Sequence, residues 1–249
     1  ESITMLITRL VPSVVKGSPL YQKMLEWYYS PRSNRASERD EYQRIGRLGK
    51  DNSNAWIRRS SEIEGWLFEG EHEFIFELAG LGTSGDILEI GSWQGKATCL
   101  MAGACIELGL ASKIICVDSF LMDGMPHQTA YHRRLVQSQG TYYQFVDNAK
   151  KHDYYDRLII LSGLSRMVLP YLQARIKLAF IDGAHDRESV ARDVDLVKPL
   201  LIKDGLIALH DADEDWPGVK EAIKSTLAND SGFKFVRQVN TLECWQRVS

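Results

Sequence analysis

The sequence predicts an α/β fold with five parallel strands, helical crossovers and an antiparallel pair of strands at the carboxyl terminus. Two observations predict this class. Beyond residue 61, short apolar runs alternate with helix-length segments, and several runs are apolar throughout, as in strands buried on both faces of a parallel sheet. Two further β-rich runs, 234–239 and 242–248, have only Asn240 and Thr241 between them, which predicts a hairpin.

Residues 1–60 are expected to form a helical or flexible appendage, and residues 61–249 the main domain. The appendage has short helical stretches broken by Pro and Gly turns, and would cap a binding site or form a homodimer contact. Ser60 or Ser61 is expected to begin a helix that continues to Leu78. The five parallel strands are expected, in chain order, at 86–90, 113–117, 158–161, 177–181 and 205–210.

Composition narrows the class of protein. The chain has 249 residues, of which 44% are hydrophobic, and fits one large globular domain with a modest appendage. No apolar run reaches the about 18 residues that a membrane span needs. Residues 1–60 hold 11 Lys and Arg against 6 Asp and Glu. A nucleic-acid-binding methyltransferase that uses this basic segment is therefore an alternative, but the net negative charge of the other residues disfavours it. Buried reduced thiols, and with them a cytoplasmic location, are expected for Cys99, Cys105, Cys116 and Cys244.

Glycines follow the first predicted strand and precede a helix. Gly91 and Gly95 lack the side chains that would keep a ligand from the loop backbone, and ligands of open α/β sheets bind at the carboxyl ends of strands. Dinucleotide loops read G-x-G-x-x-G, whereas this loop reads G-x-x-x-G and follows Glu89, whose carboxylate would repel a pyrophosphate. Asp118 follows the second strand, where a carboxylate accepts ribose hydroxyls. The pattern predicts a positively charged adenosine ligand and disfavours an NAD-dependent oxidoreductase.

The segment from Leu88 to Thr98 resembles the first motif of class I, S-adenosylmethionine-dependent methyltransferases. It has the E-I-G-x-x-x-G form seen in catechol-type and macrocin-type O-methyltransferases. The resemblance covers residues from about 61 to 249, and it implies a Rossmann-like methyltransferase sheet with S-adenosylmethionine as cofactor. It also implies the cofactor contacts: the methionine part with Glu64, Gly65, Glu89, Gly91, Ser92 and Gly95, the ribose with Asp118 and Ser119, and the adenine with Gly163 and Ser165. Asp182 is a further candidate for cofactor binding, from its place after the fourth strand.

Acids and histidines follow the fourth and fifth predicted strands, whose carboxyl ends open onto the same rim as the glycine loop. Asp182, His210 and Asp211 are expected to converge there and bind a divalent cation, Mg²⁺ or Mn²⁺, that lowers the pKa of an acceptor hydroxyl. The resembled enzymes have an acidic or Asp–Asn pair where this chain has His210-Asp211, and Asp213 is an alternative ligand. Without a metal, Asp182 would only seat the cofactor and Asp211 would cap a helix.

His185 is the candidate general base, with Asp182 as its catalytic neighbour; the alternative is a hydrogen bond to a nearby loop. The long stretch 120–157 is rich in aromatic residues and holds a candidate lid, Met122–His127, while Trp216 is expected to line the pocket. Together with the resemblance, these features predict Mg²⁺-assisted methylation of a hydroxyl on a sugar, oligosaccharide or glycosylated product. A catechol-like acceptor is the alternative. A non-catalytic adenosine-binding scaffold would leave the acids and histidines without a purpose.

Overall fold

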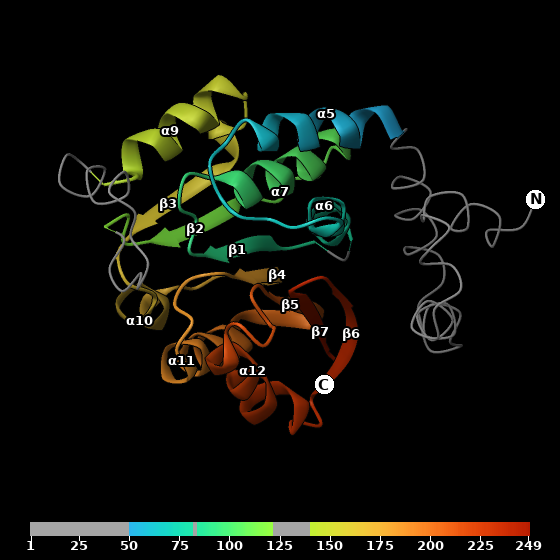
Figure 1. Cartoon of the computed structure of the whole chain (residues 1–249), viewed down its shortest axis with the longest axis vertical. Helices are drawn as coiled ribbons and strands as arrows, with labels where there is room; N and C mark the ends of the chain where they lie inside the picture. Colours follow the sequence, from blue (N-terminus) through green and yellow to red (C-terminus); the bar gives the residue numbers. More distant parts are fainter. Residues whose placement is uncertain (1–49, 82–83, 122–139) are drawn as a thin grey trace, which may run out of the picture.

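The computed structural model describes residues 50–81, 84–121 and 140–249, with the side chains of the first helix described from residue 55 onward. The predicted dimer contact in the appendage falls largely on residues 1–49 and the candidate lid on Met122–His127, and both lie outside the described residues. The described part is built on one seven-stranded sheet, with helices on both faces (Figure 1).

The sheet has the order β3-β2-β1-β4-β5-β7-β6. Strands β1 to β5 run parallel to one another, and β7 pairs antiparallel with both β5 and β6. The predicted fold of five parallel strands and a terminal hairpin is therefore confirmed. The strand bounds are β1 Asp86–Ile90, β2 Ile114–Asp118, β3 Leu158–Ser162, β4 Ile176–Ile181, β5 Leu201–Leu209, β6 Phe233–Val239 and β7 Leu242–Arg247.

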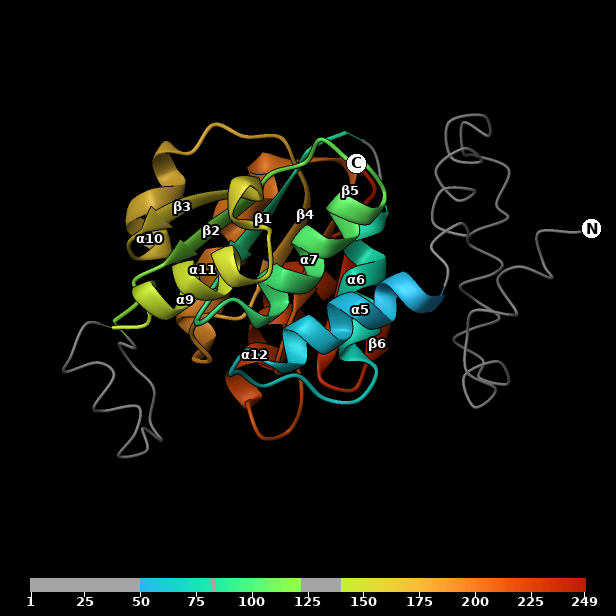
Figure 2. The same cartoon turned by 90° about the horizontal axis from the view of Figure 1, so that it is seen from above.

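Helices α5, α6, α7 and α9 cover one face of the sheet, and α10, α11 and α12 cover the other (Figures 1 and 2). No helix in the described ranges is long and apolar enough to cross a membrane. The α-helices are α5 Lys50–Ser61, α6 Glu71–Gly80, α7 Lys96–Glu107, α9 Tyr142–Lys151, α10 Ser165–Val168, α11 Arg187–Val197 and α12 Pro217–Ile223. The shorter turns are η1 Tyr155–Arg157, η2 Leu169–Tyr171, η3 Lys198–Leu200 and the π-helical η4 Lys224–Ala228.

The core has two apolar layers, one on each face of the sheet. Successive side chains of a strand point to opposite faces, so a strand that is covered on both faces is largely apolar. In β4, Leu178 and Phe180 join the layer under α6 and α7, whereas Ala179 and Ile181 join the layer under α11 and α12. All four cysteines are buried and free, as expected from their apolar surroundings.

The prediction of a helix that begins at Ser60 or Ser61 is wrong. Both serines lie in the last turn of α5, where their hydroxyls donate to backbone carbonyls instead of capping a new helix. The next helix, α6, begins only at Glu71. Gly65 and Gly70 interrupt the chain before it with φ values of 148° and 83°, which a continuous right-handed helix does not contain.

Helix α5 packs against α7 and crosses the predicted domain boundary at residues 60–61. The Trp56 ring is 3% exposed, and its Nε1–H donates to Glu107 Oε1 (3.0 Å). A Cβ on Gly103 of α7 would lie 2.3 Å from the ring, so this close approach requires a glycine. The end of α5 therefore shares the core of the sheet, while the function of the segment before it stays a prediction.

Candidate functional site

Backbone hydrogen bonds continue beyond the strand ends and hold three loops side by side. The Gly91 N–H donates to a carbonyl of β2 (3.0 Å), and the Asp182 N–H donates to the last residue of β1 (2.8 Å). The His210 N–H donates in turn to the last residue of β4 (3.1 Å). The parallel register thus brings together the glycine loop and both acid- and histidine-bearing segments that the sequence predicts at one rim.

The glycine loop packs so closely against its neighbours that a side chain at either of its two glycines would clash. Gly91 has φ 86°, and a Cβ there would lie 2.0 Å from the backbone oxygen of Asp182. Gly95 has φ 93°, and a Cβ there would lie 2.9 Å from the hydroxyl of the buried Tyr154. Both residues adopt the left-handed conformation that favours glycine. The loop backbone is consequently pressed against the end of β4, which places Asp182 beside it.

Glu89 lies beneath this loop and is fully buried. Its Oε2 accepts hydrogen bonds from the hydroxyls of Ser92 (2.7 Å) and Thr98 (2.6 Å). Its Oε1, in contrast, has no hydrogen-bond partner among the described residues. Burial raises the pKa of Glu89 to about 7, against the lowering effect of the two hydroxyls. An unsatisfied buried carboxylate oxygen is suited to a cationic ligand group.

Asp118 ends β2 and ties two loops together. Its Oδ2 accepts from the Trp93 N–H (2.8 Å) and its Oδ1 from the Phe120 N–H (2.6 Å). Both donors belong to residues with positive φ, 50° and 56° respectively, an uncommon conformation for bulky side chains. Burial raises the pKa of Asp118, although these backbone hydrogen bonds oppose the shift. Ser119, the second predicted ribose residue, accepts at Oγ from the Leu121 N–H (3.3 Å).

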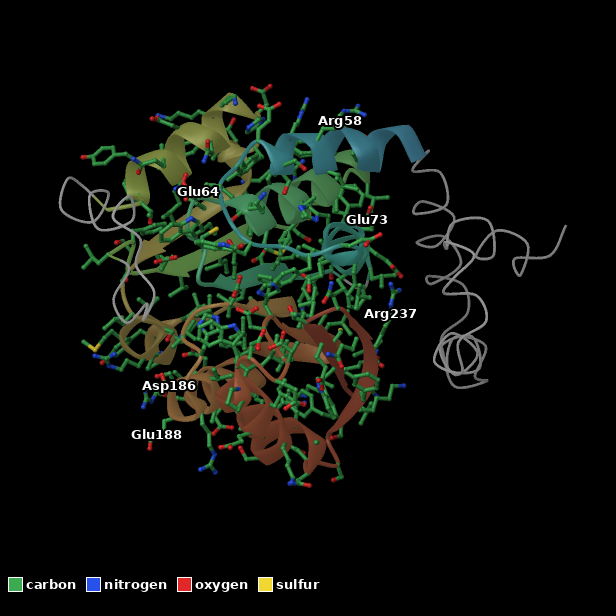
Figure 3. All side chains as sticks on the ribbon, in the orientation of Figure 1. Arg58, Glu64, Glu73, Asp186, Glu188 and Arg237 are labelled. Atoms are coloured by element: carbon green, nitrogen blue, oxygen red, sulfur yellow. The ribbon has the colours of Figure 1, made fainter. Side chains whose placement is uncertain are left out.

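Glu64 and Gly65 come from the segment between α5 and α6, on which Figure 3 labels Glu64. Glu64 Oε2 accepts from the side chain of Gln94 in the glycine loop (2.9 Å). A Cβ on Gly65 would lie 3.3 Å from the side chain of Lys96, the first residue of α7. The structure therefore brings this segment against the glycine loop, as the resemblance implies for residues that close over a ligand.

Gly163 and Ser165 follow β3 at the far side of the rim. The Gly163 N–H donates to the Asp118 carbonyl (2.8 Å), which places this loop beside the end of β2. The Ser165 hydroxyl donates to Asp193 Oδ1 of α11 (2.5 Å) and is therefore engaged within the protein. Burial raises the pKa of Asp193 to about 6.

Three potential metal-ligand atoms converge at the ends of β4 and β5. Asp182, His185 and Asp211 each offer one atom, and these atoms lie within 4.8 Å of one another. His185 Nε2 lies 2.8 Å from Asp211 Oδ2 and 3.9 Å from Asp182 Oδ1. Asp211 has φ 58°, which turns the chain sharply at this point. Burial alone would raise the pKa of Asp211, but the neighbouring imidazoles of His185 and His210 hold it well below its usual range.

His210, the third predicted ligand, lies deeper than this group and is 3% exposed. Its Nδ1 lies 3.3 Å from one oxygen of Asp182 and 3.3 Å from one oxygen of Asp211. Its Nε2 lies 3.0 Å from Glu71 Oε2. The sequence therefore identified the residues that meet, but it expected His210 as the ligand and His185 as the base, whereas the ligand-atom group contains His185. Asp213, the alternative ligand, is outside that group and accepts from the Asp215 N–H (3.0 Å).

Aromatic rings surround the histidines, and the sequence identified one of them. The Trp216 ring lies against His185, with ring centroids 4.3 Å apart and ring planes tilted by 30°. Phe68 lies over His210 at 6.3 Å and Trp66 lies near Trp93 at 5.9 Å. Phe68 and Trp66 are 47% and 52% exposed, a large fraction for such apolar side chains. Sequence reasoning missed both, because it placed them within a helix.

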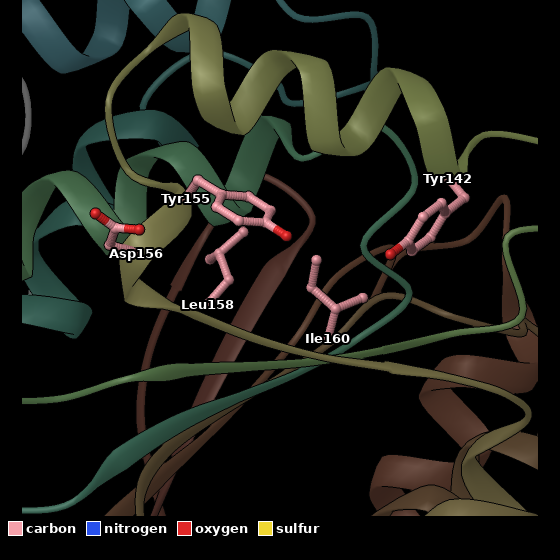
Figure 4. A pocket seen from close by; sticks show the side chains of 5 residues that line it. All are labelled: Tyr142, Tyr155, Asp156, Leu158 and Ile160. Atoms are coloured by element: carbon pink, nitrogen blue, oxygen red, sulfur yellow. The ribbon is translucent and has the colours of Figure 1, made fainter.

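A separate open cavity of about 420 Å³ lies between α9, η1 and the edge strand β3. Figure 4 shows Leu158 and Ile160 of β3 between the rings of Tyr142 and Tyr155. None of the predicted cofactor, metal or catalytic residues lines it. The aromatic residues of the described segment before Arg157 therefore have different surroundings: Phe145 is fully buried in the core, whereas Tyr142 lines this cavity.

Comparisons with known proteins agree with this arrangement. The family model described as a methyltransferase domain matches residues 88–212, half of the chain, which include the glycine loop and both loops of the acid and histidine cluster. No curated protein matches the chain significantly.

Several solved structures share the fold. The O-methyltransferase NovP is 22% identical with a TM-score of 0.60, over 72% of this chain and 80% of its own. The calicheamicin methyltransferase CalS11 is 18% identical with a TM-score of 0.56, over 92% and 93%. TomG of Streptomyces achromogenes, solved in complex with S-adenosylmethionine, is 14% identical with a TM-score of 0.55, over 81% and 91%. With the matched family model, the glycine loop and the rim beside it show that this chain belongs to the methyltransferase-domain family.

Proposed function

We propose that this protein transfers a methyl group from S-adenosylmethionine to a hydroxyl of a small saccharide-containing acceptor, with the help of a divalent cation. One observation carries the proposal: the ligand atoms of Asp182, His185 and Asp211 converge within 4.8 Å of one another beside the glycine loop. A methyl donor and a hydroxyl-activating centre would then face the same space. Membership of the methyltransferase-domain family supports a transferase and argues against the alternative of an NAD-dependent oxidoreductase.

The donor is proposed to bind along the glycine loop. S-adenosylmethionine supplies an electrophilic methyl group on a sulfonium. The partnerless Oε1 of Glu89 is the observation that fits the charge of its methionine part, and Glu64 extends over the same loop. Asp118 ends β2, and its carboxylate is proposed to accept the ribose hydroxyls. Gly163 and Ser165 follow the neighbouring strand end and are proposed to flank the adenine.

The acid and histidine cluster fits a divalent cation. Neither His185 Nε2 nor His210 Nδ1 has a hydrogen bond of proper geometry in the described part of the chain, although both face carboxylate oxygens at 3.3 Å or less. Nitrogen and oxygen atoms that crowd together in this way are suited to share a cation. Asp182, Asp211 and His185 would hold it, and a bound cation lowers the pKa of a coordinated hydroxyl. Magnesium is the proposed ion because two of the three ligands are carboxylates.

The proposed role of His185 as a cation ligand is incompatible with its predicted role as general base, because one nitrogen cannot bind a cation and accept a proton at once. With a cation, Nε2 is a ligand, and Trp216 and Asp211 hold the ring in place. Without one, the same nitrogen is the general base for the acceptor hydroxyl, with Asp182 nearby. Sensitivity to a chelator therefore decides which role His185 has.

A saccharide acceptor is supported by the surface next to the cluster. Exposed Phe68 and Trp66 and the stacked Trp216 offer flat apolar faces beside polar groups, an arrangement that suits the apolar faces of a sugar ring. CalS11, which shares the fold, is described as a TDP-rhamnose 3'-O-methyltransferase. A catechol-like acceptor would use the same rings and is the second candidate.

Transfer of labelled methyl from S-adenosylmethionine to sugars, oligosaccharides, glycosylated macrolides and catechols tests the proposal. We expect transfer to a sugar hydroxyl that EDTA abolishes and Mg²⁺ restores. Transfer that EDTA does not affect would show that the reaction needs no cation, and His185 would then be the proposed general base. Transfer to catechols alone would replace the acceptor class. Binding of S-adenosylhomocysteine without transfer to any acceptor would support the proposed donor site and contradict the proposed acceptor classes.

Two wider predictions also remain proposals: a cytoplasmic location, which the free buried cysteines support, and a homodimer contact through residues 1–60. Size-exclusion chromatography with light scattering, on the full chain and on residues 50–249, tests the contact.

A further inference from the structure

Glu71, the first residue of α6, joins three distant parts of the chain through one buried carboxylate. It is 0% exposed. Its Oε1 accepts from the Thr241 N–H and the Thr241 hydroxyl (both 2.9 Å), in the turn between β6 and β7. Its Oε2 accepts from the Phe68 N–H (2.7 Å) and lies 3.0 Å from His210 Nε2. Each carboxylate oxygen therefore has two partners.

These contacts determine how His210 is oriented. A carboxylate only accepts hydrogen bonds, so His210 Nε2 must carry a hydrogen to bond with Glu71. The ring then directs its other nitrogen, Nδ1, at one oxygen each of Asp182 and Asp211, 3.3 Å away. Since His210 is enclosed among Phe68, Phe180 and Glu71, the ring has little freedom to turn. The position of Nδ1 between the two aspartates thus depends on Glu71.

We propose that Glu71 is a positioning residue for the cation site: it holds His210 with Nδ1 toward the aspartates, and His210 in turn sets the orientation of both carboxylates. The inference rests on the proposed function for the cation, and it adds a residue outside the matched methyltransferase model. Groups that lie behind the ligands of a metal site orient those ligands through hydrogen bonds, and a carboxylate that accepts a histidine N–H is a common group of this kind. The residue that does so here comes from α6 and not from the strand ends.

The charge of Glu71 is consistent with this role. Burial alone would raise the pKa of Glu71, but the hydrogen bonds from His210, Phe68 and Thr241 outweigh burial and lower it. The group is therefore an ionised acceptor at neutral pH. A purely structural tie between α6 and the β6–β7 turn would need only the Thr241 bonds, so the two roles of Glu71 are separable.

Three proteins test the proposal: the unaltered chain, Glu71→Gln and the matched control Thr241→Val. The glutamine has nearly the same shape but no charge, and it can no longer accept hydrogen bonds at both ends. Thr241→Val removes one structural bond to Glu71 and leaves the contact with His210. Calorimetry with Mn²⁺ measures the cation affinity, and titration with S-adenosylhomocysteine reports the donor site. We expect Mn²⁺ to bind at least about tenfold more weakly to Glu71→Gln, with near-unaltered affinity in Thr241→Val and the same affinity for S-adenosylhomocysteine in all three.

The tautomer of His210 is measured independently in the unaltered, metal-free chain by ¹H–¹⁵N long-range NMR. Its signal is assigned with His210→Gln, among six histidines. We expect a hydrogen on Nε2. A His210 with Nε2 unprotonated would overturn the proposal, even if Glu71→Gln failed to fold. Equal Mn²⁺ affinity in Glu71→Gln and the unaltered chain would overturn it as well. If the unaltered chain binds no Mn²⁺, the proposed cation site is contradicted, and with it the positioning of that site by Glu71. The tautomer of His210 would still report whether Glu71 and His210 form a hydrogen bond.

Discussion

Replacing Gly91 by alanine probes the contact that brings the glycine loop and Asp182 together. The new Cβ would lie 2.0 Å from the Asp182 carbonyl oxygen and 2.5 Å from its carbonyl carbon, both backbone atoms that cannot rotate away. The φ of 86° is also unfavourable for alanine. The left-handed conformation costs about 1–2 kcal/mol, and forcing a methyl group into packed backbone costs about 1–3 kcal/mol more.

The expected loss in the free energy of unfolding is therefore about 2–5 kcal/mol. At about 2–4 °C per kcal/mol for a chain of this size, Tm should fall by roughly 4–20 °C. Gly109→Ala is the matched control, because Gly109 has φ 63° but nothing within 4 Å of its Cβ. It should show the conformational cost alone, about 1–2 kcal/mol.

Urea unfolding and thermal scans of both variants provide the measurement. The informative quantity is the difference between them, expected at about 1–3 kcal/mol in favour of Gly109→Ala. Mn²⁺ binding should weaken in Gly91→Ala alone, because relief of the clash displaces Asp182 from the cluster with His185 and Asp211. Equal stability of the two variants would refute the reasoning, since the glycine loop would then not be pressed against the end of β4.

Three other predictions follow from buried or clustered side chains. Because burial raises the pKa of Glu89 to about 7 from 4.5, the folded state holds the proton more tightly, so stability should fall by up to about 3 kcal/mol as pH rises from about 4.5 to about 7. Glu89→Gln should lack this slope in urea titrations across that range, and parallel curves would contradict the burial argument. Asp211→Asn should abolish or strongly weaken Mn²⁺ binding in calorimetry while Asp213→Asn should not, and the reverse result would restore Asp213 as the ligand. Trp56→Ala should lower the free energy of unfolding, measured in urea, by about 3–5 kcal/mol. A chain of residues 61–249 should likewise be less stable than one of residues 50–249, and equal stability of the two would show that α5 is dispensable for the fold.

Most of the sheet was predictable from local sequence. In β4, the four successive residues from Leu178 to Ile181 are apolar because both faces of the strand are covered, and this pattern is visible without knowing the neighbours. The glycine loop after β1 and the acids after β2, β4 and β5 were likewise predictable, since parallel strands present their carboxyl ends at one rim. The exception was the segment before Glu71, where apolar side chains imitate a helix while Gly65 and Gly70 interrupt it.

The depth at which each histidine lies beside the two aspartates, and what packs behind them, could be learned only from the packing of distant segments. His185 and His210 both follow strands, but His210 is 3% exposed beside Phe68 and Phe180, whereas His185 lies against Trp216. Glu71 has no local signal for its role at the site, because His210 and Thr241, the partners that join it to the strand ends, lie far along the chain. Periodicity and motifs report which face a residue occupies, whereas contacts between distant segments depend on how helices and loops pack, which short-range patterns do not encode.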